Sequence, residues 1–372
     1  MHAPHWDLFC RVVDNFGDIG VCWRLAADLA SRGRPVRLWA DDASALAWMA
    51  PAGAAGVDVH PWNDSAGATP GDVVIEAFGC DPPAAFVARM ARRTTFVARM
   101  ARRTTPPAWL NLEYLSAEAW VERCHGLPSP QLAGPGRGLV KHFFYPGFTP
   151  RTGGLLRERD LMTRRAAFDR GAWLAARGIV PRPGETLVSL FCYPHAPLPL
   201  LWRALERCAA LVLLTPGAAQ ALAARHPPPP GVRTQPLPWL TQVDYDHLLW
   251  SCDLNLVRGE DSAVRAMWAG TPFVWQLYPQ HDGAHAAKLD AFVDSFGAQA
   301  ASPPALRDWW RAWNALDDGA GVPAPSFEGW GASCRRWRDR LLAQPDLCTQ
   351  LLAWVEHRRC APAPAGTGQA PG

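Results

Sequence analysis

The stretch WDLFCRVVDNFGDIG, residues 6–20, decides the fold of this 372-residue chain. It opens with an apolar run typical of a buried strand, and the turn DNFGDIG follows directly. A helical pattern comes next, with apolar residues at Val21, Cys22, Leu25 and Leu29. Further strands are predicted at 36–40 (VRLWA) and 72–78 (DVVIEAF). Strand, helix and strand joined by short links predict a parallel, doubly wound sheet.

The same pattern starts again in the second half of the chain. Apolar runs predict more buried strands, at 187–193, 211–214, 253–257 and 273–277. Helical segments are predicted between them, at 200–208, 218–225, 262–269 and 285–296. Because the chain is also too long for one ordinary core, we expect an α/β fold of two Rossmann-like, doubly wound domains. Ligands in such folds bind beyond the carboxyl ends of the strands, which predicts a site in a central cleft.

A junction separates the two halves near residues 150–180, where GFTPRTGG and a predicted charged helix at 155–177 intervene. We predict five segments: an N-terminal Rossmann-like domain at 1–155, a linker with a helix at 156–180, a C-terminal Rossmann-like domain at 181–345, a C-terminal helix at 346–360 and a tail at 361–372. The tail, APAPAGTGQAPG, cannot bury apolar surface and is expected to be disordered.

Composition narrows the class of protein. The formal net charge of +3 gives no support for nucleic-acid binding. The ten cysteines form no CxxC pair and no Cys/His cluster with zinc spacing, so we expect reduced thiols and no metal. Neither a signal-peptide pattern nor a membrane-length apolar run is present. The sequence therefore predicts a cytoplasmic protein.

One segment is duplicated without change. FVARMARRTT occupies residues 86–95 and again 96–105. Ten extra residues in a helix add about 15 Å and rotate the downstream chain by roughly 80°. That chain keeps its packing face only if the extra turns loop out, so we expect a duplication accommodated on the surface. The alternative is an arginine patch for an acidic partner.

The first candidate loop, 14–20, carries Asp14 and Asp18 on either side of Gly17. Either carboxylate alone can serve as a helix N-cap. As a pair at a strand tip facing the cleft, they can instead hold a substrate and orient a cation. The glycines do not form GxGxxG, which argues against an ordinary dinucleotide site, and an acidic pair at 41–42 keeps a nicotinamide interpretation only weakly alive.

The second candidate loop, 258–262 (RGEDS), lies between a buried strand and a helix. Backbone N–H groups at such a helix start can bind a phosphate, although Ser262 or Asp261 can also simply cap the helix. Two acidic groups beside a diphosphate would repel it. We therefore expect Glu260 and Asp261 to accept hydrogen bonds from sugar hydroxyls or to position a cation.

Aromatic residues gather in the same half of the chain. Trp239 and Tyr245 flank Gln242, and Phe191 and Tyr193 end the strand LVSLFCY. Each ring alone is better explained by core packing than by ligand contact. Together, aromatic faces beside an amide are suited to stacking on a nucleobase and reading it.

These segments together resemble one family, the bacterial protein-arginine rhamnosyltransferases that modify translation elongation factor P (the EarP family). The resemblance covers nearly the whole chain in order. Its motifs are FCRVVDNFGDIGVCWRLA (9–26), NLEYLSAEAWVERCHGLPSPQ (111–131), KHFFYPGF (141–148), SLFCYP (189–194) and RGEDS…WAGTPFVWQLYPQHDGAH (258–285). The duplicated block and the Pro/Gly tail depart from the family pattern, and neither contains a candidate site residue.

The resemblance implies a GT-B fold, two Rossmann-like domains facing a central cleft, with the acceptor-binding domain at 1–155 and the nucleotide-sugar-binding domain at 181–345. It implies metal-independent, inverting transfer of L-rhamnose from dTDP-β-L-rhamnose to an arginine of elongation factor P, with no cofactor. Asp18 would be the general base, with Asp14 beside it and Glu260 as a further catalytic residue. The donor site would comprise Phe191, Tyr193, Trp239, Gln242, Tyr245, Arg258, Glu260, Asp261, Ser262, Gln276 and Tyr278.

Two other hypotheses stay open at this point. The first is a sugar-nucleotide-dependent glycosyltransferase of the same fold that acts on a small-molecule acceptor. The second is a protein that binds elongation factor P without catalysis. Donor turnover without a protein acceptor would favour the first, and binding without sugar transfer would favour the second.

Overall fold

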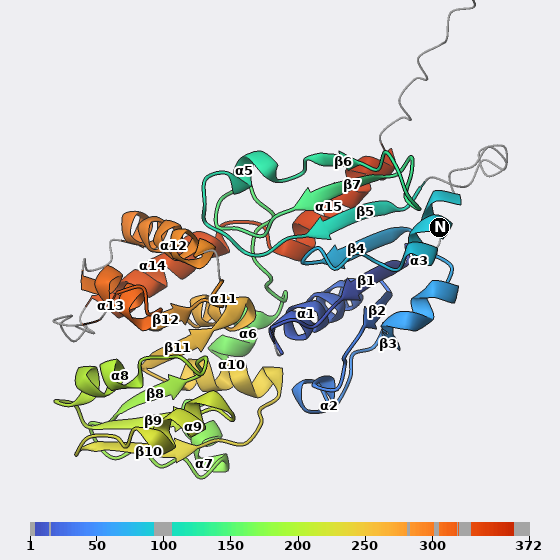
Figure 1. Ribbon diagram of the computed structural model, residues 1–372. Helices are drawn as coiled ribbons and strands as arrows, with labels where there is room; N and C mark the ends of the chain where they lie inside the picture. The colour runs from blue at the N-terminus through green and yellow to red at the C-terminus, as the bar shows by residue number, and fades with distance from the viewer. Residues whose placement is uncertain are drawn as a thin grey trace, which may run out of the picture.

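The computed structural model describes residues 4–14, 16–92, 106–280, 283–300, 305–317, 319 and 329–360. Two β-sheets, each with helices on both faces, form the two halves of the molecule (Figure 1). Side chains of both halves line the cavities between them. Every strand pairing in them is parallel except that between β6 and β7. The predicted GT-B-like architecture of two Rossmann-like domains is therefore confirmed.

The N-terminal sheet has the strand order β3-β2-β1-β4-β5-β7-β6. Its strands are β1 (Trp6–Cys10), β2 (Val36–Ala40), β3 (Val57–Pro61), β4 (Val73–Ala77), β5 (Ala108–Leu112), β6 (Pro128–Pro130) and β7 (Val140–Phe144). The helices of this half are α1 (Gly17–Ser31), α2 (Leu46–Met49), η1 (Trp62–Gly67), α3 (Ala84–Arg92) and α5 (Val121–Cys124). The chain leaves β1 toward β2 and returns to β4 on the other side, so the topological switch point lies between β1 and β4.

The C-terminal sheet has the order β10-β9-β8-β11-β12. Its strands are β8 (Thr186–Leu190), β9 (Ala210–Leu214), β10 (Val232–Pro236), β11 (Leu254–Arg258) and β12 (Phe273–Gln276). The helices around it are α6 (Leu161–Ala166), α7 (Arg170–Ala176), α8 (Leu198–Leu205), α9 (Ala218–Arg225), α10 (Gln242–Ser251), α11 (Gly259–Ala269), α12 (Ala284–Ala300), α13 (Ala305–Trp313) and α14 (Trp330–Leu342). Its switch point lies between β8 and β11.

The linker was predicted to form one charged helix at 155–177, and the structure differs. Two short helices, α6 and α7, stand there instead. Asp169 breaks the run because it adopts an extended backbone and its side chain accepts a hydrogen bond from the Ala172 N–H at 2.9 Å. That contact is an N-cap, which starts α7 as a separate helix.

The last helix, α15 (Leu347–Cys360), returns to the N-terminal half, where it lies beside β5 and β7 (Figure 1). Leu347, Cys348, Leu351 and Val355 are buried in the same hydrophobic cluster as β1 and α1. The C-terminal segment therefore completes the core of the first domain, since it covers apolar surface that the first 150 residues leave open.

The duplicated segment leaves the sheet intact. The first copy continues α3 to Arg92, and β5 pairs in parallel with both β4 and β7. The strand after the duplication therefore occupies a regular place in the sheet. The second copy lies outside the described residues, as does the tail predicted to be disordered. No helix of the described chain combines the length and the apolar character that crossing a membrane requires.

Candidate active site

The two candidate loops meet at the cleft. α1 begins directly after the turn that follows β1, and α11 begins directly after β11, both at switch points. Gly259, the first residue of α11, has φ +67°, and a Cβ there would lie 3.3 Å from Asp14 Oδ2. Only a glycine lets the two loops approach this closely without strain.

Asp14 contacts the opposite domain through Tyr193. The Tyr193 hydroxyl donates a hydrogen bond of 2.5 Å to Asp14 Oδ2. Tyr193 is buried, and both burial and the neighbouring Asp14 carboxylate raise the pKa of its hydroxyl, which therefore remains a donor. The bond directs the Asp14 carboxylate into the cleft and neutralises no charge, so Asp14 remains available to a cation.

Asp18 lies in the first turn of α1 and is 4% exposed. Its Oδ2 accepts hydrogen bonds from the N–H groups of Val13 and Asp14, at 2.8 and 2.9 Å. These bonds fix the turn after β1, so Asp18 stabilises the loop in addition to any chemical role. Burial raises the pKa of Asp18 and the nearby Asp14 adds to this, while the two backbone bonds lower it, and the balance is a raised pKa. A carboxylate of raised basicity is suited to accepting a proton.

Glu260 follows Gly259 in α11 and reaches across to the N-terminal domain. Its carboxylate accepts hydrogen bonds from the Leu115 N–H at 2.8 Å and from Lys288 Nζ at 2.6 Å. Burial raises the pKa of Glu260 despite the partly compensating Lys288. Glu260 therefore joins the two domains beside Asp14 and Asp18.

A first cavity, of about 100 Å³, lies where both domains contribute aromatic rings. It is lined by Asp14, Phe16, Gly17, Arg24, Trp48, Met49, Phe191, Thr215, Pro216, Trp239, Leu240, Gln242, Tyr245, Arg258, Gly259, Glu260, Asp261 and Ser262. The Arg258 guanidinium lies 4.6 Å from the ring centres of both Phe191 and Tyr193. A nucleoside fits such an aromatic wall, and the fixed cation is suited to its phosphates.

The start of α11 opens onto this cavity. Arg258, the N-cap residue, makes no side-chain cap hydrogen bond within the described part of the chain, and the hydroxyl of Ser262 donates to the Arg258 carbonyl. The first N–H groups of α11 therefore remain available for an anion. This contradicts the alternative in which Ser262 or Asp261 serves as the cap, because neither side chain accepts a hydrogen bond there.

A second cavity, of about 450 Å³, adjoins the first. The two share Asp14, Gly17, Gly259 and Glu260 in their linings. Carboxylates and aromatic side chains dominate the second, namely Asp14, Asp18, Glu113, Glu118 and Glu260 with Phe78, Tyr114, Trp120, Tyr145, Trp275 and Tyr278. Carboxylates beside aromatic faces suit a planar cation such as a guanidinium.

The eleven predicted donor residues separate into groups. Eight line the first cavity: Phe191, Trp239, Gln242, Tyr245, Arg258, Glu260, Asp261 and Ser262. Tyr278 lines the second cavity and packs edge-on against Tyr193, with ring centres 5.6 Å apart. Gln276 is fully buried and accepts a hydrogen bond from the Tyr193 N–H at 2.9 Å. Gln276 therefore supports Tyr193 from behind, and neither of these two residues lines either cavity.

Sequence reasoning missed the contribution of the N-terminal domain to the first cavity. Phe16 and Trp48 lie with Trp239 in one aromatic group, with ring centres 5.5 Å (Phe16–Trp239) and 4.6 Å (Trp48–Trp239) apart. Phe16 stands inside the motif at 9–26 and could have been noticed there. Trp48 stands in a four-residue helix with no motif around it, and only the fold brings it to the cleft. The same holds for Lys288, whereas Glu113 stands inside the motif at 111–131 and could have been noticed there.

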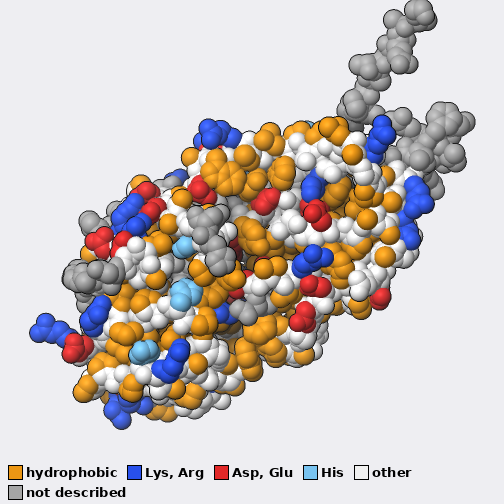
Figure 2. Space-filling model, in the orientation of Figure 1, with side chains coloured by type: hydrophobic (Ala, Val, Ile, Leu, Met, Phe, Trp, Pro, Cys, Tyr) orange, Lys and Arg blue, Asp and Glu red, His pale blue; other side chains and the backbone are white. Residues whose placement is uncertain are grey.

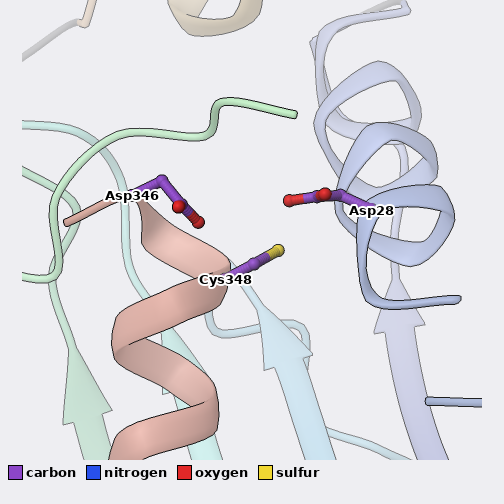
Figure 3. A group of neighbouring side chains, drawn as sticks. All are labelled: Asp28, Asp346 and Cys348. Atoms are coloured by element: carbon purple, nitrogen blue, oxygen red, sulfur yellow. The ribbon is translucent and has the colours of Figure 1, made fainter. Parts of the chain in front are cut away.

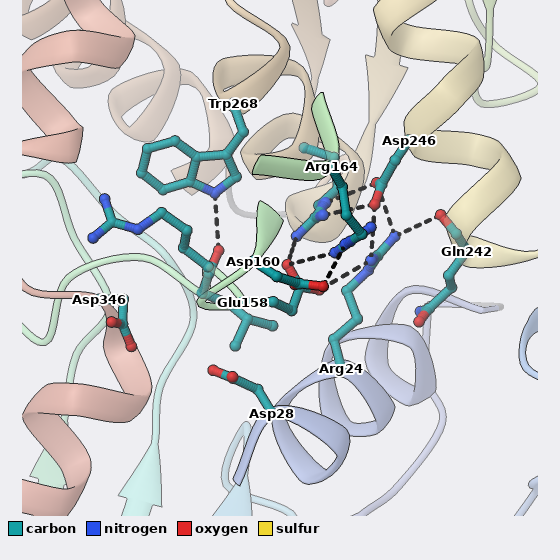
Figure 4. A network of polar contacts seen from close by, with 12 residues as sticks. Arg24, Asp28, Glu158, Asp160, Arg164, Gln242, Asp246, Trp268 and Asp346 are labelled. Carbon is teal, nitrogen blue, oxygen red and sulfur yellow. Dashed lines mark hydrogen bonds and ion pairs between the residues drawn. The ribbon is translucent and has the colours of Figure 1, made fainter. Parts of the chain in front are cut away.

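Charges below the cleft are paired in a network between the domains (Figure 4). Arg24 of α1 bonds Asp246, Asp261, Glu158 and the Gln242 carbonyl. Arg265 of α11 bonds Asp246 and Glu158. Burial works against ionisation of Glu158, but Arg265 and Arg24 lower its pKa to about 2. This network fixes how α1 sits against α10 and α11.

Another group of side chains, away from the cleft, resembles a metal site in composition. Asp28, Asp346 and Cys348 point toward one another from α1 and the start of α15 (Figure 3), with ligand atoms within 4.8 Å. Arg32 donates to Asp28 Oδ2 at 2.9 Å and to Asp346 Oδ1 at 2.7 Å. A guanidinium already neutralises the carboxylates, so the group joins two helices and does not suit a cation.

The outer surface shows no concentration of one charge on the face drawn in Figure 2. Lys and Arg side chains of the described residues are scattered among Asp and Glu over both domains. This distribution agrees with the net charge of +3, which is small for the length of the chain.

Comparison with known proteins identifies relatives over almost the full chain. The family model described as elongation factor P (EF-P) rhamnosyltransferase EarP matches residues 6–356. A protein-arginine rhamnosyltransferase of Pseudomonas putida is 45% identical over 380 residues, covering 93% of this chain and 97% of its own. One from Neisseria meningitidis serogroup B is 34% identical, covering 94% and 96%.

Solved structures agree. A structure described as the basis for EarP-mediated arginine glycosylation of translation elongation factor EF-P superposes with a TM-score of 0.62 at 29% identity, covering 96% of this chain and all of that one. The calicheamicin glycosyltransferase CalG4 superposes with a TM-score of 0.52 at 16% identity, covering 97% of this chain and 100% of that one, and this shows the fold alone.

Proposed function

The chain belongs to the EarP family of elongation factor P rhamnosyltransferases, and on that premise we propose its reaction in detail. It transfers L-rhamnose from dTDP-β-L-rhamnose to an arginine side chain of elongation factor P, with inversion at the anomeric carbon. One observation carries the proposal: an aromatic cavity at an uncapped helix start adjoins a carboxylate-lined cavity, and Asp14 and Glu260 line both.

The donor belongs to the first cavity in this proposal. Phe191, Trp239 and Tyr245 supply faces for the thymine, whose π surface gains from stacking. The diphosphate meets the N–H groups of α11 and the Arg258 guanidinium. These groups supply the positive charge that the departing dTDP needs, and no metal ion or cofactor is required for that step. Gln242 donates to the Gly20 carbonyl at 3.0 Å, so it supports the cavity wall as well as lining it.

The acceptor arginine belongs to the second cavity. A free guanidinium has a pKa above about 12 and a delocalised lone pair, so it is a poor nucleophile. Asp14 can hold the cation and orient one nitrogen toward the anomeric carbon, whereas the charge of Glu260 beside it is already paired with Lys288. As the nitrogen–carbon bond forms and the carbon–oxygen bond to the diphosphate breaks, Asp18 accepts the proton that the nitrogen loses.

The arrangement of the two cavities suits inversion. Attack must come from the face of the sugar opposite the diphosphate, and the diphosphate-binding helix start and Asp18 come from different domains. Contacts across the cleft, including that of Glu260 with Leu115, also exclude water that would otherwise hydrolyse the donor. The acceptor works in translation, so we propose that the enzyme acts in the cytoplasm.

Mass spectrometry tests this proposal directly. Purified elongation factor P incubated with the chain and dTDP-β-L-rhamnose should gain one deoxyhexose on an arginine. Replacement of that arginine by lysine in the acceptor is the matched control and should abolish the mass shift. Unmodified acceptor under conditions where dTDP is bound, or steady donor turnover without any protein acceptor, would contradict the proposal.

A further inference from the structure

Arg24 stands on α1 in the N-terminal domain, but the side-chain contacts described above join it to other parts of the chain. Its side chain is 5% exposed, and the four groups that it bonds all lie in the linker or the C-terminal domain. Figure 4 shows three of them, Glu158, Gln242 and Asp246. Its Nη2 donates to the Gln242 carbonyl at 3.1 Å and to Asp246 Oδ1 at 3.2 Å. One side chain thus anchors α1 to the first turns of α10 and α11.

Two of these partners line the first cavity. Arg24 itself, Gln242 and Asp261 all contribute to its wall. Arg24 Nε lies 3.2 Å from Asp261 Oδ2 and 3.1 Å from Oδ1. Among the described residues, no other side chain bonds the Asp261 carboxylate. The orientation of this carboxylate at the cavity wall therefore depends on a residue of the other domain.

Arg265 provides an internal comparison, because it bonds two of the same carboxylates. It donates to Asp246 through Nε at 2.8 Å and Nη2 at 2.6 Å, and to Glu158 Oε2 at 2.7 Å. Arg24 contacts the same two groups at longer distances, 3.2 to 3.4 Å. Arg265 therefore suffices to pair Asp246 and Glu158, whereas the contact to Asp261 belongs to Arg24.

We propose that Arg24 is a positioning residue of the donor site, which orients the Asp261 carboxylate for the sugar nucleotide and does so only while the two domains are together. This inference rests on the proposed donor site. Arg24 approaches Asp261 through Nε, while its Nη atoms bond Glu158, Asp246 and the Gln242 carbonyl. The Nη contacts fix the guanidinium, and the planar group then directs Nε at Asp261; a lysine ammonium cannot reach all of these groups in the same geometry. Donor affinity is therefore coupled to the contact between α1 and α11.

Matched lysine variants test this role. Arg24→Lys and Arg265→Lys each keep a positive charge and leave Asp246 and Glu158 one arginine partner. Both should lower the melting temperature, since each disturbs a buried ion pair. In calorimetric titration with dTDP-β-L-rhamnose, Arg24→Lys should weaken binding about tenfold and Arg265→Lys less than threefold, because a charge-assisted contact at the site is lost only in the former. The inference is overturned if the factor for Arg24→Lys is no larger than that for Arg265→Lys.

A double-mutant cycle provides the second measurement. If Arg24 acts through Asp261, then adding Arg24→Lys to Asp261→Asn should cost no further affinity, and additive losses would contradict the inference. If the wild-type chain binds UDP-glucose or GDP-mannose in place of the dTDP sugar, the proposed function is contradicted and the role of Arg24 is not. The affinities of the variants are then measured with the nucleotide sugar that binds. A chain that binds none of the three contradicts both.

Discussion

The Tyr193 hydroxyl donates a 2.5 Å hydrogen bond to Asp14 Oδ2, and this bond crosses the cleft from the end of β8 to the turn after β1. Gln276 holds the backbone of Tyr193 from behind, and Arg258 covers its ring. Tyr193 thus contacts both Arg258, which faces the proposed leaving diphosphate, and Asp14, which faces the proposed acceptor. The first prediction concerns this bond.

Tyr193→Phe removes the hydroxyl and keeps the ring under Arg258. We expect kcat to fall about tenfold, because Asp14 loses the charge-assisted bond that directs it into the cleft. The affinity for dTDP should stay within about threefold of wild type, since the cation–π contact survives. Initial rates with elongation factor P and calorimetric titration with dTDP separate the two effects. An equal loss of affinity and rate would assign Tyr193 to the donor site alone.

Asp18→Asn should abolish most turnover while leaving donor binding intact. A general base contributes roughly 10²- to 10⁴-fold, so kcat should fall by at least about 100-fold. The asparagine carbonyl can still accept the hydrogen bonds from Val13 and Asp14, so the melting temperature should change little. Rate and thermal unfolding are measured on the same preparation. A large drop in melting temperature with activity retained would make Asp18 only a loop-fixing residue.

The acid limb of the pH–rate profile should reflect the raised pKa of Asp18. The base works when deprotonated, so kcat/KM should fall as pH falls, and the midpoint should lie above the ordinary aspartate value of about 3.9. The negative charge of Asp14 contributes to the raised pKa of Asp18. In Asp14→Asn, the midpoint of the acid limb of the residual activity should therefore move to a lower pH. A midpoint unchanged by that substitution would assign the limb to another group.

Gly259→Ala should damage the site beyond its cost in stability. At φ +67° an alanine costs about 1–3 kcal/mol of strain, and its Cβ would lie 3.3 Å from Asp14 Oδ2 and 3.4 Å from the Tyr193 hydroxyl. Gly33→Ala is the matched control, because Gly33 has φ +75° and open space around the Cβ position. The melting temperature should fall in both variants, but kcat should fall only in Gly259→Ala. Equal activity in the two variants would mean that the contact at Gly259 is unimportant.

Tyr245→Ala should weaken dTDP binding by about 1–3 kcal/mol if its ring stacks on the base. Tyr245 packs edge-on against Phe191 with ring centres 5.7 Å apart and also borders the hydrophobic core, so this variant loses stability as well. Tyr245→Phe keeps the ring and should bind dTDP nearly as wild type does. Calorimetry on both variants distinguishes stacking from packing, and unchanged affinity in Tyr245→Ala would return Tyr245 to the core.

The sequence predicted the fold class because apolar runs and turn residues record local structure directly. The runs at 36–40 and 72–78 are strands β2 and β4, nearly to the residue. Five strands were not predicted: β3, β5, β6, β7 and β10. The residues of β3 and β6 are mostly exposed or partly exposed and carry little apolar signal. The interrupted linker helix was also missed, since one capping side chain at Asp169 outweighs the helical pattern around it.

The candidate loops were visible in the sequence, and their partners were not. Asp14, Asp18, Arg258 and Glu260 stand in long motifs at strand ends, where parallel sheets place ligands. Lys288 and Trp48 reach the cleft from segments without such a signal. Leu115 stands in the motif at 111–131, but its contact with Glu260 is made by a backbone N–H, which no side-chain pattern announces. Gln276 is the opposite case. Its motif suggested contact with the ligand, but its side chain accepts a hydrogen bond from the Tyr193 N–H.

What the sequence determined by itself is therefore the alternation of strand and helix, the two cleft loops and the family. What only the tertiary structure decided is which groups share a contact: Arg24 with Asp261, Asp14 with Tyr193, Glu260 with Leu115. The reason is physical. Local patterns fix backbone conformation through neighbours a few residues apart, whereas these contacts join residues more than 140 positions apart and exist only because two separately folded sheets meet at one cleft.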